Sequence, residues 1–174
     1  MFDEYELPVA TRKTRRRSQW DRSSLCGGAD WKNQDFKCVH CRGYVSTHIS
    51  LAGVHNRNHC PSCLWSRHMD LVQAGDRLSA CKAGMRPVGL TLKISQKKYV
   101  FGQSGELMLV HRCTDCENVS INRIAADDDA ECILAVFEES LHLPEMQMRH
   151  IEDIGIRVLQ ADDLWIVQAR LFGQ

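Results

Sequence analysis

Cys38-Val39-His40-Cys41 is followed, after 18 intervening residues, by Cys60-Pro61-Ser62-Cys63, which gives the spacing C-x2-C-x18-C-x2-C. Two cysteines with two residues between them lie on one tight turn, where both sulfurs can reach the same ion. This spacing is typical of a structural zinc site; the alternatives are two unrelated thiol pairs, or an iron–sulfur or redox site. It predicts a first zinc ion held by Cys38, Cys41, Cys60 and Cys63, which leaves no open position for catalysis.

A third pair, Cys113-Thr114-Asp115-Cys116, lies at the end of a β-prone stretch and indicates a second zinc site. Two more ligands are needed for a tetrahedral ion. Cys81 lies in a turn of small residues and is the best third ligand. The second site is therefore expected to contain Cys81, Cys113 and Cys116 with one histidine.

The histidine of the second site is left open among His68, His111 and His59. We favour His68, because it follows the second cysteine pair and precedes Asp70, whose carboxylate could orient the free ring nitrogen. His111 is a rival because a strand residue two positions before Cys113 shares a face with it.

The chain has nine cysteines and no apolar segment near its start that would act as an export signal. Thiols in a reducing cytosol favour metal over disulfides, and an odd number argues against a closed disulfide framework. We therefore expect a cytoplasmic protein with two zinc ions and no membrane span. A turn-rich body gains only a few kcal/mol from its core, so structural zinc, worth about 10–16 kcal/mol, is expected to hold it in shape.

The 174 residues carry 22 basic and 22 acidic side chains, but the two kinds are segregated along the chain. Residues 1–10 have a net charge of −3, residues 11–100 of +12 and residues 101–174 of −9. Zinc-bound thiolates offset part of the basic excess. The basic half indicates an anionic partner, nucleic acid above all, unless the two halves face each other. The arginines expected to contact nucleic acid are Arg15, Arg16, Arg17, Arg57, Arg67 and Arg77.

β-prone stretches occupy the cysteine-rich part of the chain, and helical periodicity begins after it. Strands are expected over Val88–Ile94, Lys98–Phe101 and Leu107–Arg112, the last two joined as a hairpin. Capping aspartates and apolar residues at helical spacing predict a helix over 127–142. Pro144 opens a second short helix, which Gly155 ends. The tail is expected to form a β-hairpin from Ile156–Leu159 and Leu164–Phe172.

These elements predict an α+β fold in three parts. Residues 1–35 form a basic flexible arm, because the run around residues 12–17 has nothing to bury. Residues 36–126 form a body of small zinc-ribbon-like β knuckles with both metal sites. Residues 127–174 add the C-terminal helix and hairpin.

Arg57-Asn58-His59-Cys60-Pro61 resembles the motif that gives the RNHCP domain family its name. The similarity extends from about residue 36 to about residue 136 and includes Cys81 and His111-Arg112-Cys113-Thr114-Asp115-Cys116. Glu117 departs from the glycine that often follows the last cysteine in the family. The resemblance implies paired zinc-ribbon-like knuckles but no activity. It also marks polar positions that could be ligands or their surroundings, namely His68, Asp70, Asp76, Arg77 and His111.

Three kinds of function follow from these patterns. The first is an accessory module that binds RNA or a ribonucleoprotein such as the ribosome, with structural zinc. The second is a protein-interaction or regulatory scaffold, which an exposed apolar stripe on residues 130–172 would favour. The third is a metal-dependent hydrolase or nuclease, which needs an open metal position beside Asp70 or Asp76. No catalytic residue and no small-molecule cofactor are predicted.

Overall fold

The computed structural model of the chain describes residues 35–73, 75–93 and 105–173. The predictions for the basic arm, with Arg15, Arg16 and Arg17, and for a strand over Lys98–Phe101 lie outside these residues.

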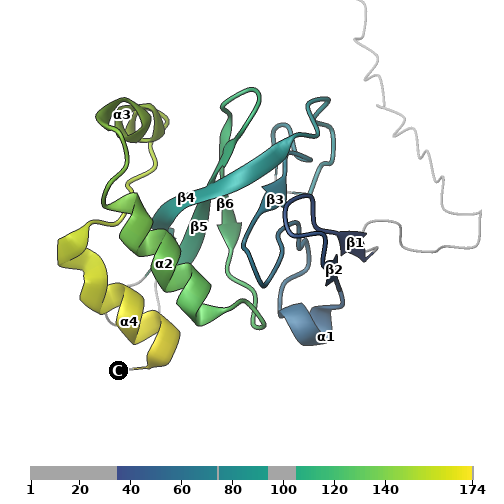
Figure 1. Cartoon of the computed structure of the whole chain (residues 1–174), viewed down its shortest axis with the longest axis horizontal. Helices are drawn as coiled ribbons and strands as arrows, with labels where there is room; N and C mark the ends of the chain where they lie inside the picture. The colour runs from purple at the N-terminus through teal and green to yellow at the C-terminus, as the bar shows by residue number, and fades with distance from the viewer. Residues whose placement is uncertain (1–34, 74, 94–104, 174) are drawn as a thin grey trace, which may run out of the picture.

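Two antiparallel sheets form the framework, and three longer helices follow them in the chain (Figure 1). The small sheet pairs β1 (Phe36–Lys37) with β2 (Tyr44–Val45), and α1 (Ile49–Ala52) follows it. The larger sheet has the order β3 (Ser66–Arg67), β4 (Gly84–Lys93), β5 (Glu106–Cys113) and β6 (Val119–Arg123). The helices are α2 (Ala130–Ser140), α3 (Glu145–Asp153) and α4 (Leu164–Phe172). The α+β class is thus confirmed.

The core lies between β4, β5 and helix α2. Leu90 and Leu109 face each other across the two strands and are fully buried. Ile133 and Phe137, one helical turn apart on α2, pack against them. Asp129 caps this helix by accepting hydrogen bonds from the amides of Glu131 and Cys132, as predicted for the aspartate run. The sheet thereby holds the helices on one side and the cysteine turns at its other end (Figure 1).

The predicted C-terminal hairpin is wrong, because residues 164–172 form helix α4. Its branched residues read as a strand, but apolar side chains at Val167 and Leu171 have helical spacing and pack against the core. Asp163 accepts a hydrogen bond from the amide of Gln160 and pairs with Arg157, which fixes the turn before the helix. Residues 156–160 form no strand, although the Leu159 amide still donates to the carbonyl of Leu90.

A glycine is required at position 89, where β4 has an irregular register beside Pro87. A Cβ there would lie 2.9 Å from Cγ1 of Val158 and 3.2 Å from Cβ of Ser140, both buried residues. We expect Gly89→Ala to lower the free energy of unfolding by about 1–3 kcal/mol, since the core would have to shift. Urea unfolding measures this loss. The loss caused by Gly89→Ala should be smaller in a Val158→Ala background. An unchanged urea midpoint for Gly89→Ala would contradict the packing described.

Candidate metal centres

The first cysteine cluster brings together the four thiols that the spacing predicts. Cys38 and Cys41 come from the turn after β1, and Cys60 and Cys63 from the turn before β3. Sγ atoms lie 3.6 Å apart between Cys38 and Cys63 and between Cys41 and Cys60. Tetrahedral zinc with Zn–S distances of about 2.3 Å needs sulfurs about 3.8 Å apart, and a disulfide needs about 2.05 Å. The cluster therefore has the geometry of a zinc site.

Backbone amides in the first turn favour the charged sulfur. The amide of His40 donates to Sγ of Cys38 at 3.4 Å. A hydrogen bond from the backbone of Gly43 is the main reason that the pKa of Cys41 falls to about 7, against the opposing effect of burial. A thiolate is the form that binds zinc, so the turn prepares the ligand for the metal.

The second cluster consists of His68, Cys81, Cys113 and Cys116, and its four ligand atoms all lie within 4.8 Å of one another. Sγ of Cys81 and Sγ of Cys113 are 3.6 Å apart. Nδ1 of His68 lies 3.2 Å from Sγ of Cys116, so Nδ1 is the ring nitrogen that faces the sulfurs. Three thiols and one imidazole fit a closed structural zinc site. The two clusters together fit two zinc ions, and no disulfide joins the described cysteines.

Asn118, and not Asp70, lies on the second ring nitrogen of His68. Its carboxamide is 3.1 Å from Nε2. When Nδ1 binds a metal, Nε2 carries the proton, so the amide oxygen is the partner that this ring needs. The expected role of Asp70 is therefore wrong. Nothing in the sequence pointed to Asn118, which lies six residues beyond the strand predicted over Leu107–Arg112.

Asp70 and Asp76 shape the loop between β3 and β4. The carboxylate of Asp70 accepts hydrogen bonds from the amides of Gly75 and Arg77. Asp76 accepts from four amides, and those of Gln73 and Leu71 contribute most to holding its pKa below the ordinary value. Neither carboxylate belongs to either metal cluster among the described residues, so the arrangement expected of a hydrolase is not formed.

His111, the rival ligand, lies in the core instead. Its Nε2 donates to the carbonyl of Leu64 at 2.6 Å, and the amide of Asn122 lies 2.9 Å from Nδ1. Burial lowers its pKa to about 3, so the ring stays neutral and links β5 to the second cysteine turn and to β6.

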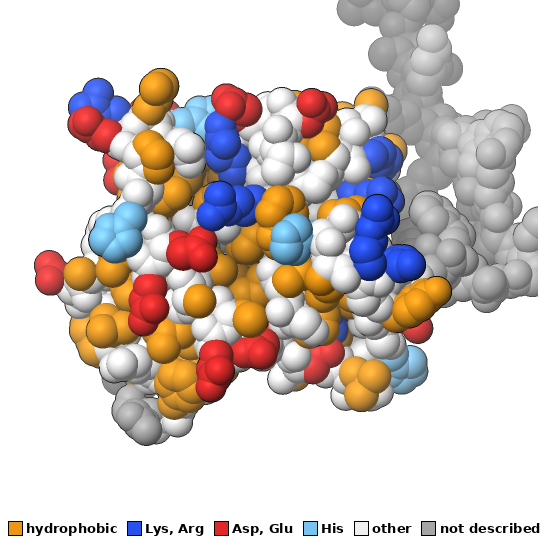
Figure 2. All heavy atoms as spheres, viewed as in Figure 1, with side chains coloured by type: hydrophobic (Ala, Val, Ile, Leu, Met, Phe, Trp, Pro, Cys, Tyr) orange, Lys and Arg blue, Asp and Glu red, His pale blue; other side chains and the backbone are white. Residues whose placement is uncertain are grey.

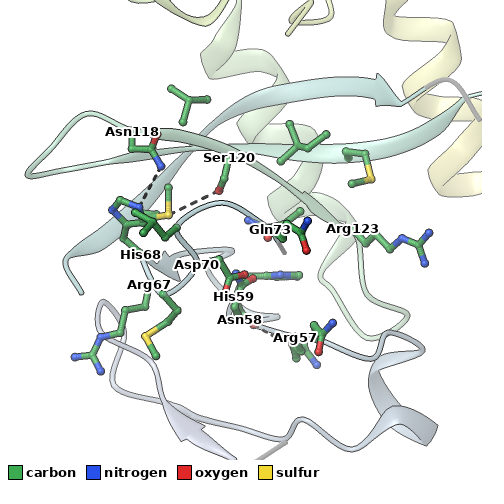
Figure 3. A pocket seen from close by; sticks show the side chains of 18 of the residues that line it. Arg57, Asn58, His59, Arg67, His68, Asp70, Gln73, Asn118, Ser120 and Arg123 are labelled. Atoms are coloured by element: carbon green, nitrogen blue, oxygen red, sulfur yellow. Dashed lines mark hydrogen bonds between the residues drawn. The ribbon is translucent and has the colours of Figure 1, made fainter. Parts of the chain in front are cut away.

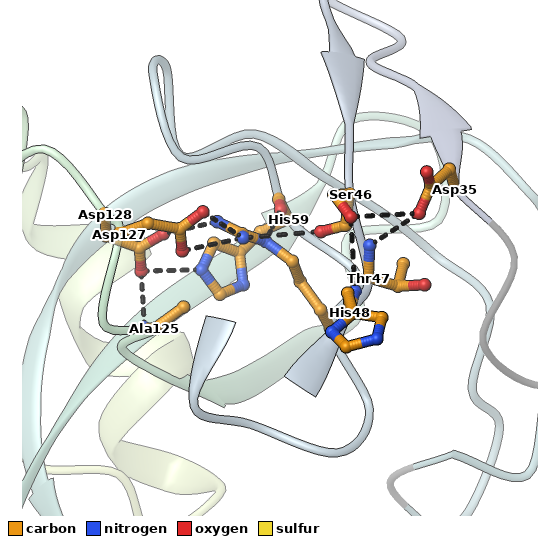
Figure 4. A network of polar contacts seen from close by, with 9 residues as sticks. Asp35, Ser46, Thr47, His48, His59, Ala125, Asp127 and Asp128 are labelled. Atoms are coloured by element: carbon orange, nitrogen blue, oxygen red, sulfur yellow. Dashed lines mark hydrogen bonds and ion pairs between the residues drawn. The ribbon is translucent and has the colours of Figure 1, made fainter. Parts of the chain in front are cut away.

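Arg57, which we expected on a nucleic-acid surface, is 1% exposed and lies inside the protein. Its guanidinium pairs with Asp127 at 2.7 Å and with Asp128 at 2.9 Å (Figure 4). The ring of His59 pairs with the second oxygen of Asp128 at 2.7 Å, and His59 belongs to neither metal cluster. This Arg57–Asp128–His59 clasp ties the cysteine turns to the start of α2. The prediction that Arg57 contacts nucleic acid is wrong. Its acidic partners lie 70 and 71 residues away in the chain, so the local sequence did not indicate that it is buried.

Two closed four-ligand centres on short β turns define a zinc-binding protein of zinc-ribbon-like build, in which metal serves structure. The RNHCP domain model matches residues 33–134, more than half of the chain, and the chain belongs to this family. No curated protein and no solved structure matches it. No helix in the described part of the chain is long and apolar enough to span a membrane.

Proposed function

We propose that this protein is a zinc-stabilised accessory module that binds RNA, alone or in a ribonucleoprotein such as the ribosome. The proposed interface is the surface of residues 35–83, called here the knuckle face, with the cations Lys37, Arg42, Arg67, Arg77 and Lys82.

The observation that supports this most is how ion pairs are distributed. Outside the knuckle face, arginines of the sheet and helices pair with carboxylates, for example Arg86 with Glu139 and Arg123 with Glu106. Among the described residues of 35–83, the one arginine that pairs with a carboxylate is Arg57, which is buried. None of the other five cations forms an ion pair with another described residue. Lys82 donates to the carbonyl of Arg77 at 3.1 Å, but no carboxylate neutralises its charge. Cations without carboxylate partners are available to phosphates.

Acidic side chains do not cancel these cations directly. Residues 35–83 contain three aspartates, and each accepts hydrogen bonds from backbone amides. Asp35 accepts from the amide of Thr47 at 2.8 Å, and Asp70 and Asp76 serve the loop described above. Figure 2 shows blue side chains gathered at the edge of the molecule near β1 and β2, with red ones mainly over the helices.

Aromatic rings accompany the cations. Tyr44 is 86% exposed, and Nζ of Lys37 lies 5.8 Å from the centre of its ring. Trp65 stacks on His40 with ring centres 4.4 Å apart, so this indole is held in place. Aromatic side chains beside cations are the usual means of binding unpaired bases and phosphates together.

Charge reversal on the knuckle face tests the proposal. We expect Arg67→Glu in the full chain to weaken binding to a short RNA by about tenfold and to make its salt dependence shallower by about one unit of slope. Arg149→Glu makes the same change of net charge on α3, in an exposed pair with Glu145, and should have little effect. Fluorescence anisotropy over a salt series measures both. Equal losses in the two variants, or no RNA binding by the parent chain, would refute the proposal.

A protein partner is the second candidate, because α4 exposes an apolar face. Trp165 is 55% and Phe172 is 48% exposed, seven residues apart on one side of the helix. Photo-crosslinking in cells separates the candidates. A crosslinker at position 67 should capture RNA, whereas one at position 165 should capture protein if the scaffold function holds.

A further inference from the structure

A hollow of about 410 Å³ opens on the knuckle face between β1 and β3. Apolar and aromatic side chains form its walls, among them Phe36, Val39 and Trp65. The cations Lys37 and Arg77 also line it. Asp35 lines it too, but the carboxylate is engaged by Thr47 and Ser46. An apolar wall with adjacent cations suits a flat heteroaromatic ring that carries a negative charge nearby.

A second hollow of about 740 Å³ lies between residues 67–73 and strand β6 (Figure 3). The two hollows share Asn58, Arg67 and Met69 in their walls. Figure 3 shows Arg67 reaching outward while Asp70 and Gln73 face the interior of the second hollow. The walls of this hollow combine apolar side chains, such as Val119 and Ile121, with the amide of Gln73.

His59 lines the second hollow, and a buried atom of its ring has no partner among the described residues. Nδ1 of His59 is buried and forms no hydrogen bond with any described residue, while Nε2 is held by Asp128. Native proteins rarely leave a buried ring nitrogen unpaired, and a ligand or water is the usual partner. At the accessible wall of the hollow, the side-chain amide of Gln73 suits a ligand with hydrogen-bonding groups on its edge.

We propose that the two hollows receive neighbouring bases of a single-stranded RNA, with Arg67 on the phosphate between them. This inference rests on the proposed function and specifies its ligand. Bases in a duplex are stacked and paired inside the helix and cannot enter such hollows, whereas unpaired bases can leave the stack. The shared wall at Arg67 favours a strand over a lone small molecule, since one cation then serves two base positions.

The test compares three probes on the full, zinc-loaded chain, namely a short mixed-sequence single-stranded RNA, the same strand in a duplex, and AMP. The single strand is expected to bind at least about tenfold more tightly than the duplex, because one stacked base contributes about 1–3 kcal/mol. Met69→Trp fills the wall that the hollows share and should remove this preference. Met146→Trp adds the same ring at an 81% exposed position on α3 and should preserve it.

Phe36→Leu is the second variant, for use if Met69→Trp folds poorly. It keeps an apolar side chain against Val45 but removes the aromatic ring from the first hollow. It should reduce the single-strand preference and keep both zinc ions. Equal affinity for strand and duplex, sensitive to Arg67→Glu, would overturn this inference and leave RNA binding intact. AMP binding as tightly as the strand would also overturn it. Failure of both RNAs to bind would overturn the proposed function as well.

Discussion

Replacing Cys60 by serine is expected to eject zinc from the first centre and to unfold the cysteine turns around it. Binding of a structural zinc contributes about 10–16 kcal/mol, as much as or more than the whole stability of an ordinary domain. The local core offers little else, because the buried cluster there consists of Cys38, Val45 and Cys60. Two of these three residues are ligands. Losing the metal therefore removes most of what orders β1 and β2.

Cys132→Ser is the matched control for this change. Cys132 is half-buried on α2, its Sγ lies 3.4 Å from the carbonyl oxygen of Ser62, and it belongs to neither metal cluster. It should keep both zinc ions and lose little stability. Zinc analysis and urea unfolding of both variants decide the matter. A Cys60→Ser protein with two zinc ions and an unchanged urea midpoint would be incompatible with a structural centre.

Replacing Arg57 by leucine is expected to lower the free energy of unfolding by about 3–5 kcal/mol. Removing one partner of a buried ion pair leaves the other charge uncompensated, and the side chain of Asp128 is fully buried. The guanidinium also donates to the carbonyl of His59, so its loss weakens the link between the cysteine turns and α2. Lysine should not restore the stability, because one ammonium cannot reach both aspartates in the same geometry.

Arg86→Leu provides the comparison, since its pair with Glu139 is exposed on both sides. That change should cost less than about 1 kcal/mol. Zinc content should stay at two ions in both variants if Arg57 acts through the clasp and not through the metal. A loss below about 1 kcal/mol for Arg57→Leu would show that the clasp does not carry the fold.

The metal ligands could be predicted because their signal is local and their chemistry restrictive. Two sulfurs on one turn can bind a single ion whatever the rest of the fold is. The spacing of the pairs that begin at Cys38 and Cys60 therefore predicts the first site by itself. The second site also follows from its cysteines. The sequence left the histidine of this site open because any histidine can be a ligand. In the structure, Asn118 contacts the free ring nitrogen of His68, whereas the ring of His111 donates to the carbonyl of Leu64 in the core.

Long-range polar partners could not be predicted in the same way. Arg57 looked like a surface cation because nothing near it in the sequence says that Asp127 and Asp128 fold over it. Those aspartates indicated only a helix cap, which is the role of Asp129. The prediction of a hairpin in the tail was wrong for a different reason. Ile166 and Val167 favour strands, whereas Val167 and Leu171 pack against the core from a helix.

Native mass spectrometry of the full chain, purified without chelators, tests the central claim most directly. Two closed centres predict a folded species that carries two zinc ions, with all nine thiols reduced. A folded species without zinc, or one whose mass shows disulfides in place of metal, would contradict the account.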